Sequence, residues 1–372
     1  MNKRELKILE AFGEPIADGG QEAFVFGVMK HMDMTGLKID CLTAYDCQSK
    51  RYNDLVESLG GKVYALKLPF APGKSRMNIA RPFKKFLQTH RYDIVHVHSG
   101  SISVLAIMAS VADQAGVEKV IVHSHATGRK DSVKHKVLRY LASLSMRKHV
   151  DVYCACSQKA ADWKFEPKYS KQAKIIKNGI DIQRFAFDKD KRRQMRYELG
   201  INDQTLVIGH VGRFTAEKNQ KFLIEVFKEL QKIMPDSKLL LVGDGEMQAK
   251  LQRSCSASGI EDKVIFTGSV TNAEDYLMTM DVFVMPSLFE GLGIAAVEAQ
   301  AAGLPVYLSD RIPSEVLITG VSKALPLKAG PQKWADEICK AHVRQREKNL
   351  EQFKDSDFLI ANTAIRFRRL YT

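Results

Sequence analysis

Short apolar runs alternate with longer mixed segments along the first half of the chain. Each run has the length of a strand, and each following segment is long enough for a helix. The six runs are L-K-I-L-E-A-F, G-L-K-I-D-C-L-T, V-Y-A-L-K-L, Y-D-I-V-H-V-H, K-V-I-V-H-S-H and D-V-Y-C-A-C-S. Strands that alternate with helices predict parallel β-α units, so we expect a doubly wound α/β domain here.

The same alternation resumes in the second half of the chain. Five further runs are T-L-V-I-G-H-V-G-R, S-K-L-L-L-V-G-D-G, K-V-I-F-T-G, D-V-F-V-M-P-S and P-V-Y-L-S-D. Between the two sets, Asn178-Gly179 predicts a turn, and a polar stretch rich in Lys and Arg follows it. A chain of 372 residues has room for two cores. We therefore predict two Rossmann-like domains, residues 1–182 and 183–352, facing across a cleft, and a final helix over 353–372.

The segment E-G-L-G-I-A-A-V-E-A-Q-A-A-G-L-P, residues 290–305, combines a glycine loop with two carboxylates. The loop of Gly291, Leu292 and Gly293 opens a helix, where free N–H groups and the helix dipole favour a diphosphate. Glu290 lies in the loop and Glu298 about two turns inward, so both can accept hydrogen bonds from hydroxyls of a sugar and a ribose. The alternative is an ordinary strand-to-helix turn with an acidic N-terminal residue.

Two cations follow another predicted strand. In G-R-F-T-A-E-K-N-Q, Arg213 and Lys218 lie around a helix start, where together they can neutralise the charge of a leaving diphosphate. The alternative is a pair of surface cations. Near the front, Gly19-Gly20 also precedes a helical run, and its amides can approach a phosphate, although a plain turn has the same sequence.

Histidines stand at the ends of two predicted strands, as His96-Val97-His98 and His123-Ser124-His125. No carboxylate joins them in the sequence at ligand spacing, so a metal site is not indicated. The two Asp-x-Asp motifs, at 188–190 and 355–357, have the character of solvated helix starts. We therefore expect that catalysis requires no metal and no cofactor.

The net charge of +13 resides almost entirely in the first half of the chain. Residues 1–180 hold 29 Lys or Arg against 17 Asp or Glu, while residues 181–372 hold 27 against 26. The segment 129–149 predicts an amphipathic helix with an apolar stripe of Val133, Val137, Leu141 and Leu144 among basic residues. Either this stripe packs on the domain, or the helix docks on acidic lipid headgroups.

Other classes of function and location are disfavoured. A nucleic-acid partner is not expected, because the chain has no zinc knuckle, no aromatic-rich RNA-binding strand and no clear helix-turn-helix pattern. No apolar stretch reaches the roughly 18 residues of a membrane-spanning helix, and acidic residues interrupt the start of the chain. The six cysteines show no C-x-x-C spacing. We expect a cytoplasmic protein attached peripherally to the inner face of the cell membrane.

The motif of a Glu, seven residues and a second Glu, preceded by a strand ending P-S and followed by G-L-P, resembles the donor site of retaining glycosyltransferase family 4. The likeness extends from the first strand to about residue 345, and it is strongest to enzymes of bacterial exopolysaccharide and capsule synthesis. The resemblance implies the GT-B fold, in which the final helix crosses back onto the first domain. It places Arg213 and Lys218 on the diphosphate and Val270 near the base.

The resemblance also assigns the remaining site residues. It makes His123 the active-site histidine, with His125 as the alternative, and it places the Gly19-Gly20 loop toward the donor. Gln21 departs from the Ala that the family commonly has there. The implied reaction moves a sugar from a nucleotide diphosphate, UDP in the first place, to a lipid-linked or oligosaccharide acceptor. Two alternatives remain, a GT-B sugar-nucleotide epimerase and a catalytically silent GT-B partner subunit.

Overall fold

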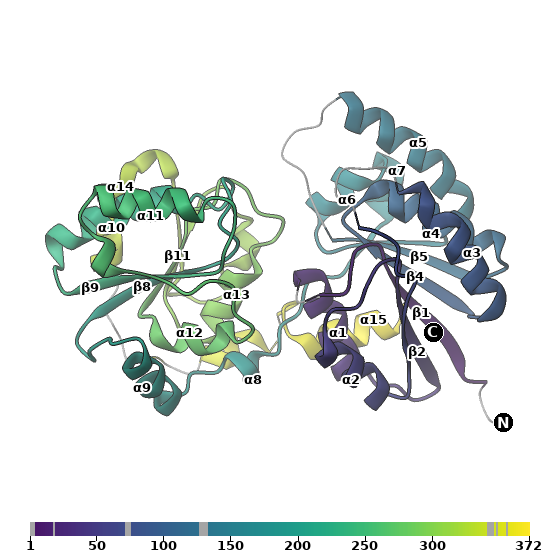
Figure 1. The fold of residues 1–372 in the computed structure, drawn as a ribbon, viewed down its shortest axis with the longest axis horizontal. Coiled ribbons are helices and arrows are strands. Elements are labelled where there is room, and N and C mark those ends of the chain that lie inside the picture. The colour runs from purple at the N-terminus through teal and green to yellow at the C-terminus, as the bar shows by residue number, and fades with distance from the viewer. Residues whose placement is uncertain are drawn as a thin grey trace. The chain divides into compact units, whose positions relative to one another are not determined.

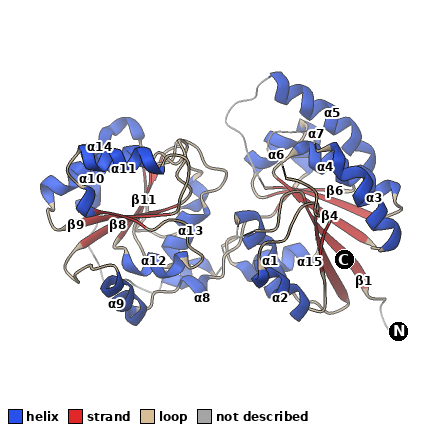
Figure 2. Cartoon of the chain, in the orientation of Figure 1, coloured by secondary structure: helices blue, strands red, loops and turns tan. Residues whose placement is uncertain are grey.

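A computed structural model of the chain describes residues 4–17, 19–70, 76–125, 133–340, 346, 349–354 and 356–372. The chain forms two compact units (Figures 1 and 2). The first comprises Met1–Gly179 and Ile360–Thr372, and the second comprises Ile180–Leu359. The chain therefore passes from the first unit to the second after Gly179 and returns at Ile360, later than the residue 353 of the sequence prediction.

The sheet of the first unit has seven strands, all paired in parallel, in the order β3-β2-β1-β4-β5-β6-β7. The strands are β1 (Leu6–Phe12), β2 (Leu37–Thr43), β3 (Val63–Ala65), β4 (Ile94–Ser99), β5 (Lys119–Ser124), β6 (Val152–Ala155) and β7 (Lys174–Ile175). The first six follow the six apolar runs of the sequence. The two-residue edge strand β7 was not predicted.

Helices cover both faces of this sheet (Figure 1). One face packs against α1 (Gly20–His31), α2 (Lys50–Ser58) and α15 (Ile360–Arg368). The other packs against α3 (Ala80–Thr89), α4 (Ile102–Gln114), α5 (Val133–His149) and α6 (Gln158–Lys164), with α7 (Pro167–Gln172) beside α6. Odd-numbered residues of β1 and β4 face the second group, and even-numbered residues face the first. This period of two is the alternation expected along a strand.

The C-terminal segment completes the first unit. Ile360, Ala364 and Phe367 of α15 lie in the same buried cluster as Phe24 of α1. A Cβ on Gly179 would lie 2.8 Å from the Ile360 Cα. The segment that leaves the first unit at Gly179 and the segment that returns at Ile360 therefore approach closely at this glycine. Segments 180 residues apart in the sequence thus share one core.

The second unit holds a six-stranded parallel sheet in the order β10-β9-β8-β11-β12-β13. Its strands are β8 (Leu206–Val211), β9 (Ser237–Val242), β10 (Val264–Phe266), β11 (Val282–Met285), β12 (Val306–Ser309) and β13 (Lys323–Leu325). The first five follow the predicted runs, and the edge strand β13 was missed. The prediction of two Rossmann-like parallel sheets is therefore confirmed.

Two layers of helices enclose the second sheet. One layer is α10 (Gln220–Ile233), α11 (Gln248–Ala257) and α14 (Gly330–Cys339), and the other includes α8 (Ile182–Phe185), α12 (Ala273–Thr279) and α13 (Ile294–Ala301). The basic helix α9 (Lys189–Glu198) packs beside α12. In the part of the chain that the structure describes, no helix is long and apolar enough to cross a membrane.

A buried carboxylate connects α9 to this sheet. Asp281 accepts hydrogen bonds from Arg192 Nη2 at 2.6 Å, from Arg196 Nη1 at 3.3 Å and from the Val207 amide at 2.8 Å. The Arg196 side chain is itself 1% exposed. Because both charges are buried, each depends on its partner to offset the cost of leaving water.

We predict that Asp281→Ala lowers the free energy of unfolding by about 3–5 kcal/mol, because it leaves a buried guanidinium without its carboxylate. Denaturant unfolding followed by circular dichroism measures this change. As a control, Glu351→Ala removes a carboxylate that is 77% exposed in its pair with Lys354, and a surface change of this kind stays within about 0.5 kcal/mol. Equal effects of the two substitutions would contradict the prediction.

Candidate functional site

Two predicted site residues meet at the carboxyl ends of neighbouring strands of the second unit. Lys218 follows β8 and Glu290 follows β11, and these strands pair directly. Lys218 Nζ lies 2.8 Å from Glu290 Oε1 and 3.0 Å from Oε2. The Glu290 side chain is 9% exposed and that of Lys218 is 24% exposed, so the ion pair is reachable but largely shielded. The structure therefore brings these two residues together, although 72 positions separate them.

Backbone hydrogen bonds fix the two loops that carry this pair. Asn219 adopts a left-handed conformation with φ of 56°, and its Nδ2 donates to the Pro286 carbonyl at 3.1 Å. The Leu288 amide donates to the Glu217 carbonyl at 2.8 Å. These two hydrogen bonds hold the loop of Lys218 next to the loop of Glu290.

A second set of bonds lies beneath Arg213, and sequence reasoning missed it. The buried amide of Gln220 donates to the Arg213 carbonyl at 3.0 Å and contacts Nε2 of His210 at 3.4 Å. His210 Nδ1 donates to the Val284 carbonyl at 2.9 Å. Burial lowers the pKa of His210 to about 4, so the ring is neutral and its Nε2 can accept. The only sequence signal was a histidine within the apolar strand β8.

Arg213 itself is exposed, and its loop rests against the loop that follows β9. A Cβ on Gly245 would lie 2.5 Å from the Phe214 carbonyl oxygen, and one on Gly243 would lie 2.3 Å from that of Gly212. Only glycine permits this approach. The Gly243 amide also donates to the Gly268 carbonyl at 3.0 Å, which joins the loop after β10. Val270, further along that loop, is half-buried against the core.

The glycine loop that opens α13 has the conformation that its sequence requires. Gly293 is the N-cap residue with φ of 86°, a left-handed conformation that favours glycine. A Cβ there would lie 3.3 Å from Ile312 Cγ2. Leu292 is buried, while Gly291 is half-buried. The glycine loop therefore connects Glu290 to the first amides of α13, an eight-residue helix.

Glu298 has a different environment from Glu290. It lies within α13 and is half-buried. The charges of Arg184 and Glu274, which form an ion pair at 2.8 Å, both act on its carboxyl group. Burial raises the pKa of Glu298 to about 7, and the positive charge of Arg184 acts in the opposite direction. A carboxyl with this pKa is partly protonated near neutral pH, so it can both donate and accept hydrogen bonds.

In the first unit, Gly19 and Gly20 begin helix α1. Gly19 is the N-cap, and a Cβ there would lie 2.3 Å from the Glu22 carboxylate. Gly20 has open space around its Cα. The nearby residue Asp18 lies outside the described residues. The glycine pair is thus placed at a helix N-terminus, as the sequence predicted.

The strand-end histidines form a buried polar cluster with a carboxylate that the sequence did not connect to them. Glu10 Oε2 lies 2.5 Å from His98 Nε2. His98 Nδ1 lies 2.9 Å from His125 Nε2. The interpretation that no carboxylate joins the histidines is therefore wrong, because strand pairing places Glu10 of β1 beside His96 of β4.

The two candidates for the active-site histidine differ in exposure. His123 is 0% exposed and contacts Phe24 edge-on, whereas His125 is half-buried at the end of β5. Burial holds the pKa of both well below the usual range, and burial raises the pKa of Glu10 to about 8.

Comparisons with known proteins agree on one family. The model described as "Glycosyltransferase Family 4" matches residues 18–184, and the model described as "Glycosyl transferases group 1" matches residues 191–353. The chain is 29% identical over 358 residues to the putative glycosyltransferase EpsF of Bacillus subtilis, covering 93% of this chain and 89% of that protein. The chain belongs to glycosyltransferase family 4. Both of its units are thus accounted for by one enzyme class.

Other proteins similar to this family 4 glycosyltransferase agree on class and fold. It is 31% identical to an Escherichia coli protein named UDP-Gal:alpha-D-GlcNAc-diphosphoundecaprenol alpha-1,3-galactosyltransferase, over 61% of this chain and 60% of that one. The solved structure of Anabaena Alr3699/HepE with UDP and glucose aligns with a TM-score of 0.76 and 20% identity, covering 98% and 99% of the two chains. At that identity the likeness shows the GT-B fold.

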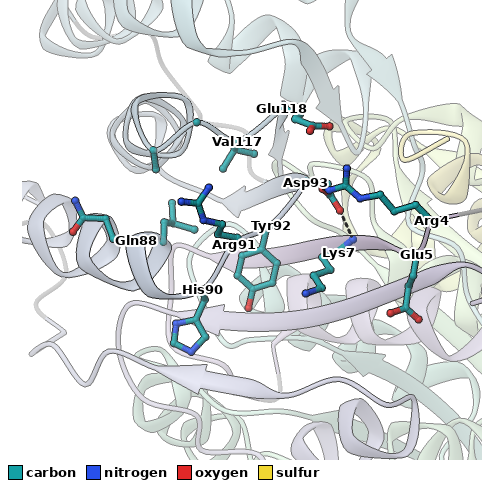
Figure 3. Close-up of a pocket in the computed structure, with 13 residues that line it drawn as sticks. Arg4, Glu5, Lys7, Gln88, His90, Arg91, Tyr92, Asp93, Val117 and Glu118 are labelled. Atoms are coloured by element: carbon teal, nitrogen blue, oxygen red, sulfur yellow. Dashed lines mark hydrogen bonds and ion pairs between the residues drawn. The ribbon is translucent and has the colours of Figure 1, made fainter.

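The glycosyltransferase also has a cavity in its first unit, at the end of the sheet where strands begin (Figure 3). None of the predicted site residues lines this cavity. Its volume is about 590 Å³, and it lies at the amino ends of β1, β4 and β5. Arg4 and the Lys7 amide both bond to Asp93 there. The predicted residues instead follow the carboxyl ends of strands, where ligands of such sheets bind.

Helix α5 of the glycosyltransferase turns an apolar face to solvent. The large side chains that are between 39% and 79% exposed are Val133, Val137, Leu138, Tyr140, Leu141 and Leu144. The residues that pack on the unit are Ala142, Ser143 and Met146. The predicted stripe is therefore not a packed face. Residues 129–132 of the predicted helix lie outside the described residues.

We predict that Gln220→Leu lowers the free energy of unfolding of this glycosyltransferase by about 1–3 kcal/mol, because it leaves the Arg213 carbonyl and His210 Nε2 without a donor in a buried site. Denaturant titration gives the value. The matched control is Gln332→Leu on the exposed side of α14, whose amide donates to the Asp336 carboxylate. A change within about 0.5 kcal/mol in Gln220→Leu, the level of an ordinary surface substitution, would refute the role of this bond.

Proposed function

We propose that this glycosyltransferase takes a sugar from a nucleotide diphosphate, UDP in the first place, and transfers it with retention to a lipid-linked or oligosaccharide acceptor in the synthesis of bacterial cell-surface polysaccharide. The observation that carries the proposal is the Lys218–Glu290 pair, held at the carboxyl ends of β8 and β11 directly before the glycine loop of α13. A cation paired with a carboxylate, and a helix N-terminus a few residues after that carboxylate, match a diphosphate joined to a sugar.

Several names among the relatives support the finer parts of this proposal. The Escherichia coli relative is named for a UDP-sugar donor and a diphosphoundecaprenol acceptor. The HepE structure contains UDP and glucose. EpsF and EpsD of Bacillus subtilis are both named as putative glycosyltransferases. These properties belong to those proteins, and we extend them to this chain as a hypothesis.

In the proposed reaction the acceptor hydroxyl attacks the anomeric carbon from the face that the diphosphate leaves. The bond from that carbon to the phosphate oxygen breaks, the new glycosidic bond forms, and a phosphate oxygen takes the hydroxyl proton. Lys218, the exposed Arg213 and the amides after Gly291 stabilise the charge of the leaving diphosphate. This mechanism assigns no step to a metal ion.

The carboxylates hold hydroxyls in this proposal. Glu290 already bonds to Lys218, and a diphosphate would attract the same ammonium group, which leaves the Glu290 oxygens to accept from the donor sugar. Glu298 receives the ribose hydroxyls. Gly19 and Gly20 provide amides, and Val270 lies near the base. For the histidine, the half-buried His125 is better exposed for contact with the sugar than the fully buried His123.

The test is the thermal unfolding midpoint of the purified protein with UDP, GDP or ADP, each with and without EDTA. We expect a rise with UDP that EDTA does not remove, and UDP at 100 times its dissociation constant adds about 2.7 kcal/mol. Lys218→Ala should lose most of this rise and reduce turnover of the UDP-sugar roughly 100-fold or more, the cost of removing one group that stabilises a leaving charge.

The matched control for that test is Lys221→Ala, a neighbouring exposed lysine on α10. It should keep both the UDP response and the turnover. Wild-type turnover in the Lys218→Ala protein would overturn the assignment of Lys218. Conversion of the UDP-sugar without any acceptor would point to an epimerase, and no response to any nucleotide would favour the silent subunit.

We further propose that α5 docks the enzyme on the anionic inner surface of the membrane, where its lipid-linked acceptor is held. The exposed apolar residues of α5 lie among the exposed cations Lys136 and Lys148. Apolar side chains beside basic ones are the composition of a helix that lies in the lipid interface. Each basic residue near an anionic surface adds about 1 kcal/mol.

Sedimentation with vesicles tests this docking. Wild-type protein should bind vesicles containing phosphatidylglycerol and not pure phosphatidylcholine, because both the charge and the apolar face contribute. The double variant Val137→Glu, Leu141→Glu should bind at least roughly 10-fold more weakly, since two exposed apolar anchors are replaced by like charges. The control pair Ile233→Glu, Met234→Glu changes two exposed apolar residues of the second unit and should bind as wild type. Unchanged binding of the α5 variant would refute the proposal.

A further inference from the structure

Three histidines of the first unit converge on one face of the sheet. His96 and His98 are two residues apart on β4, and His98 pairs in register with His123 on β5. Register partners on neighbouring parallel strands, and residues two apart on one strand, all face the same side. Each of the three side chains is 0% exposed. The imidazoles are therefore enclosed by protein rather than directed at solvent.

Aromatic residues from two helices cover this group. Phe24 of α1 lies with its ring centroid 5.7 Å from that of His123, and Phe367 of α15 lies 5.0 Å from His96. Such surroundings hold little water, so each polar atom must find its partner within the protein. The hydrogen bonds of the histidine nitrogens can then be accounted for one by one.

Three of the histidine nitrogens have no hydrogen-bond partner among the described residues. His96 Nδ1 donates to the Tyr371 hydroxyl at 3.0 Å, but His96 Nε2 has no partner among the described residues. Both nitrogens of His123 are buried and likewise have no partner in the described part of the chain. An unsatisfied buried polar atom costs about 1–3 kcal/mol. The three atoms belong to two rings whose centroids lie 5.5 Å apart, so one ligand placed between the rings could contact both histidines.

We propose that His96, His98 and His123 bind one zinc ion. Each offers one ring nitrogen, and these three nitrogens lie within 4.8 Å of one another. Zinc binds imidazole at about 2.0–2.1 Å in tetrahedral geometry, so the rings need to close by roughly 1 Å. Neutral imidazole is the form that binds metal, and a set of imidazoles suits zinc among the common divalent ions.

The surrounding hydrogen bonds favour this arrangement. His96 directs Nδ1 to Tyr371, which leaves the Nε2 lone pair for the ion. His98 directs Nε2 to Glu10, which leaves Nδ1, now beside His125. Tyr371 also donates to Glu10 and so connects the two supports. A metal-binding histidine commonly donates its other nitrogen to a carboxylate or another oxygen, and these outer contacts orient the ring.

The three proposed ligands all belong to the first unit, and His98 Nδ1 also lies 2.9 Å from His125, the histidine that the proposed function places at the sugar. The site joins β4 and β5 to the segment after α15 through Tyr371, all within the first unit. Lys218, Glu290 and the glycine loop of α13 belong to the second unit. The proposal therefore does not rest on the proposed donor site, and each can fail without the other.

The experiment uses full-length protein without a histidine tag, dialysed against EDTA and then titrated with Zn²⁺ or Co²⁺. We expect one ion per chain by elemental analysis, a visible Co²⁺ absorption of tetrahedral type, and a higher thermal midpoint with zinc. His96→Gln and His123→Gln should each weaken binding at least about 100-fold, since each removes a ligand. Glu10→Gln, which removes only a supporting contact, should weaken it roughly 10- to 100-fold.

The control is His31→Gln, an exposed histidine of α1, which should bind zinc as wild type does. Circular dichroism checks that each variant is folded, and Tyr371→Phe provides a milder change if a histidine variant is not. Wild-type protein that takes up no stoichiometric metal would overturn the proposal. Undiminished zinc binding by folded His123→Gln, or a loss of binding equal in His31→Gln, would do the same.

Discussion

Every strand pair in both sheets is parallel, and this constraint determines where chemistry can be placed. Parallel strands run in one direction, so all the loops that follow them emerge at one edge of the sheet. Residues far apart in sequence are thereby collected without any direct signal between them. Lys218 and Glu290 meet in this way at the ends of β8 and β11, and two hydrogen bonds to backbone carbonyls join the loops that carry them.

The same constraint explains the glycines of the second unit. Loops that leave neighbouring strands at one edge must pass close to one another. The loop after β9 lies so close to the loop after β8 that a Cβ on Gly243 or Gly245 would overlap a backbone carbonyl of that neighbouring loop. These glycines are therefore needed for packing between loops, and any contact they make with a nucleotide comes in addition.

Sequence reasoning predicted the strands well because apolar runs in a sheet buried on both faces are nearly continuous. It missed the edge strands β7 and β13, which each begin with an exposed lysine, so no apolar run marks them. The edge strands β3 and β10 are as short as β13 but lie in longer apolar runs. It identified Lys218, Glu290 and the α13 loop because glycine and charge leave local signals. It could not see the Gln220–His210 contact, whose two residues are separated by a loop and joined only by tertiary packing.

Two other features show the same limit. Periodicity predicted the apolar stripe of α5, but it could not tell whether the stripe faces protein or solvent, because amphipathicity gives a direction only relative to the helix itself. The carboxylate of Glu10 lies 86 residues before His96, and only the pairing of β1 with β4 brings them together. A buried polar cluster assembled across strands is therefore invisible to motif spacing, although each histidine in it was noticed.

The return of the chain to the first unit has a consequence for how the protein is made. Phe367, Leu370 and Tyr371 are each no more than 3% exposed in the core of that unit, yet a ribosome reaches them only after synthesising all of residues 180–359. Until then the face of β1, β4 and β5 that carries Glu10 and the histidines lacks the part of its cover that α15 and the residues after it provide. The first unit to be synthesised is thus the last to be completed, and a chaperone or the lipid surface could meet its open face during that interval.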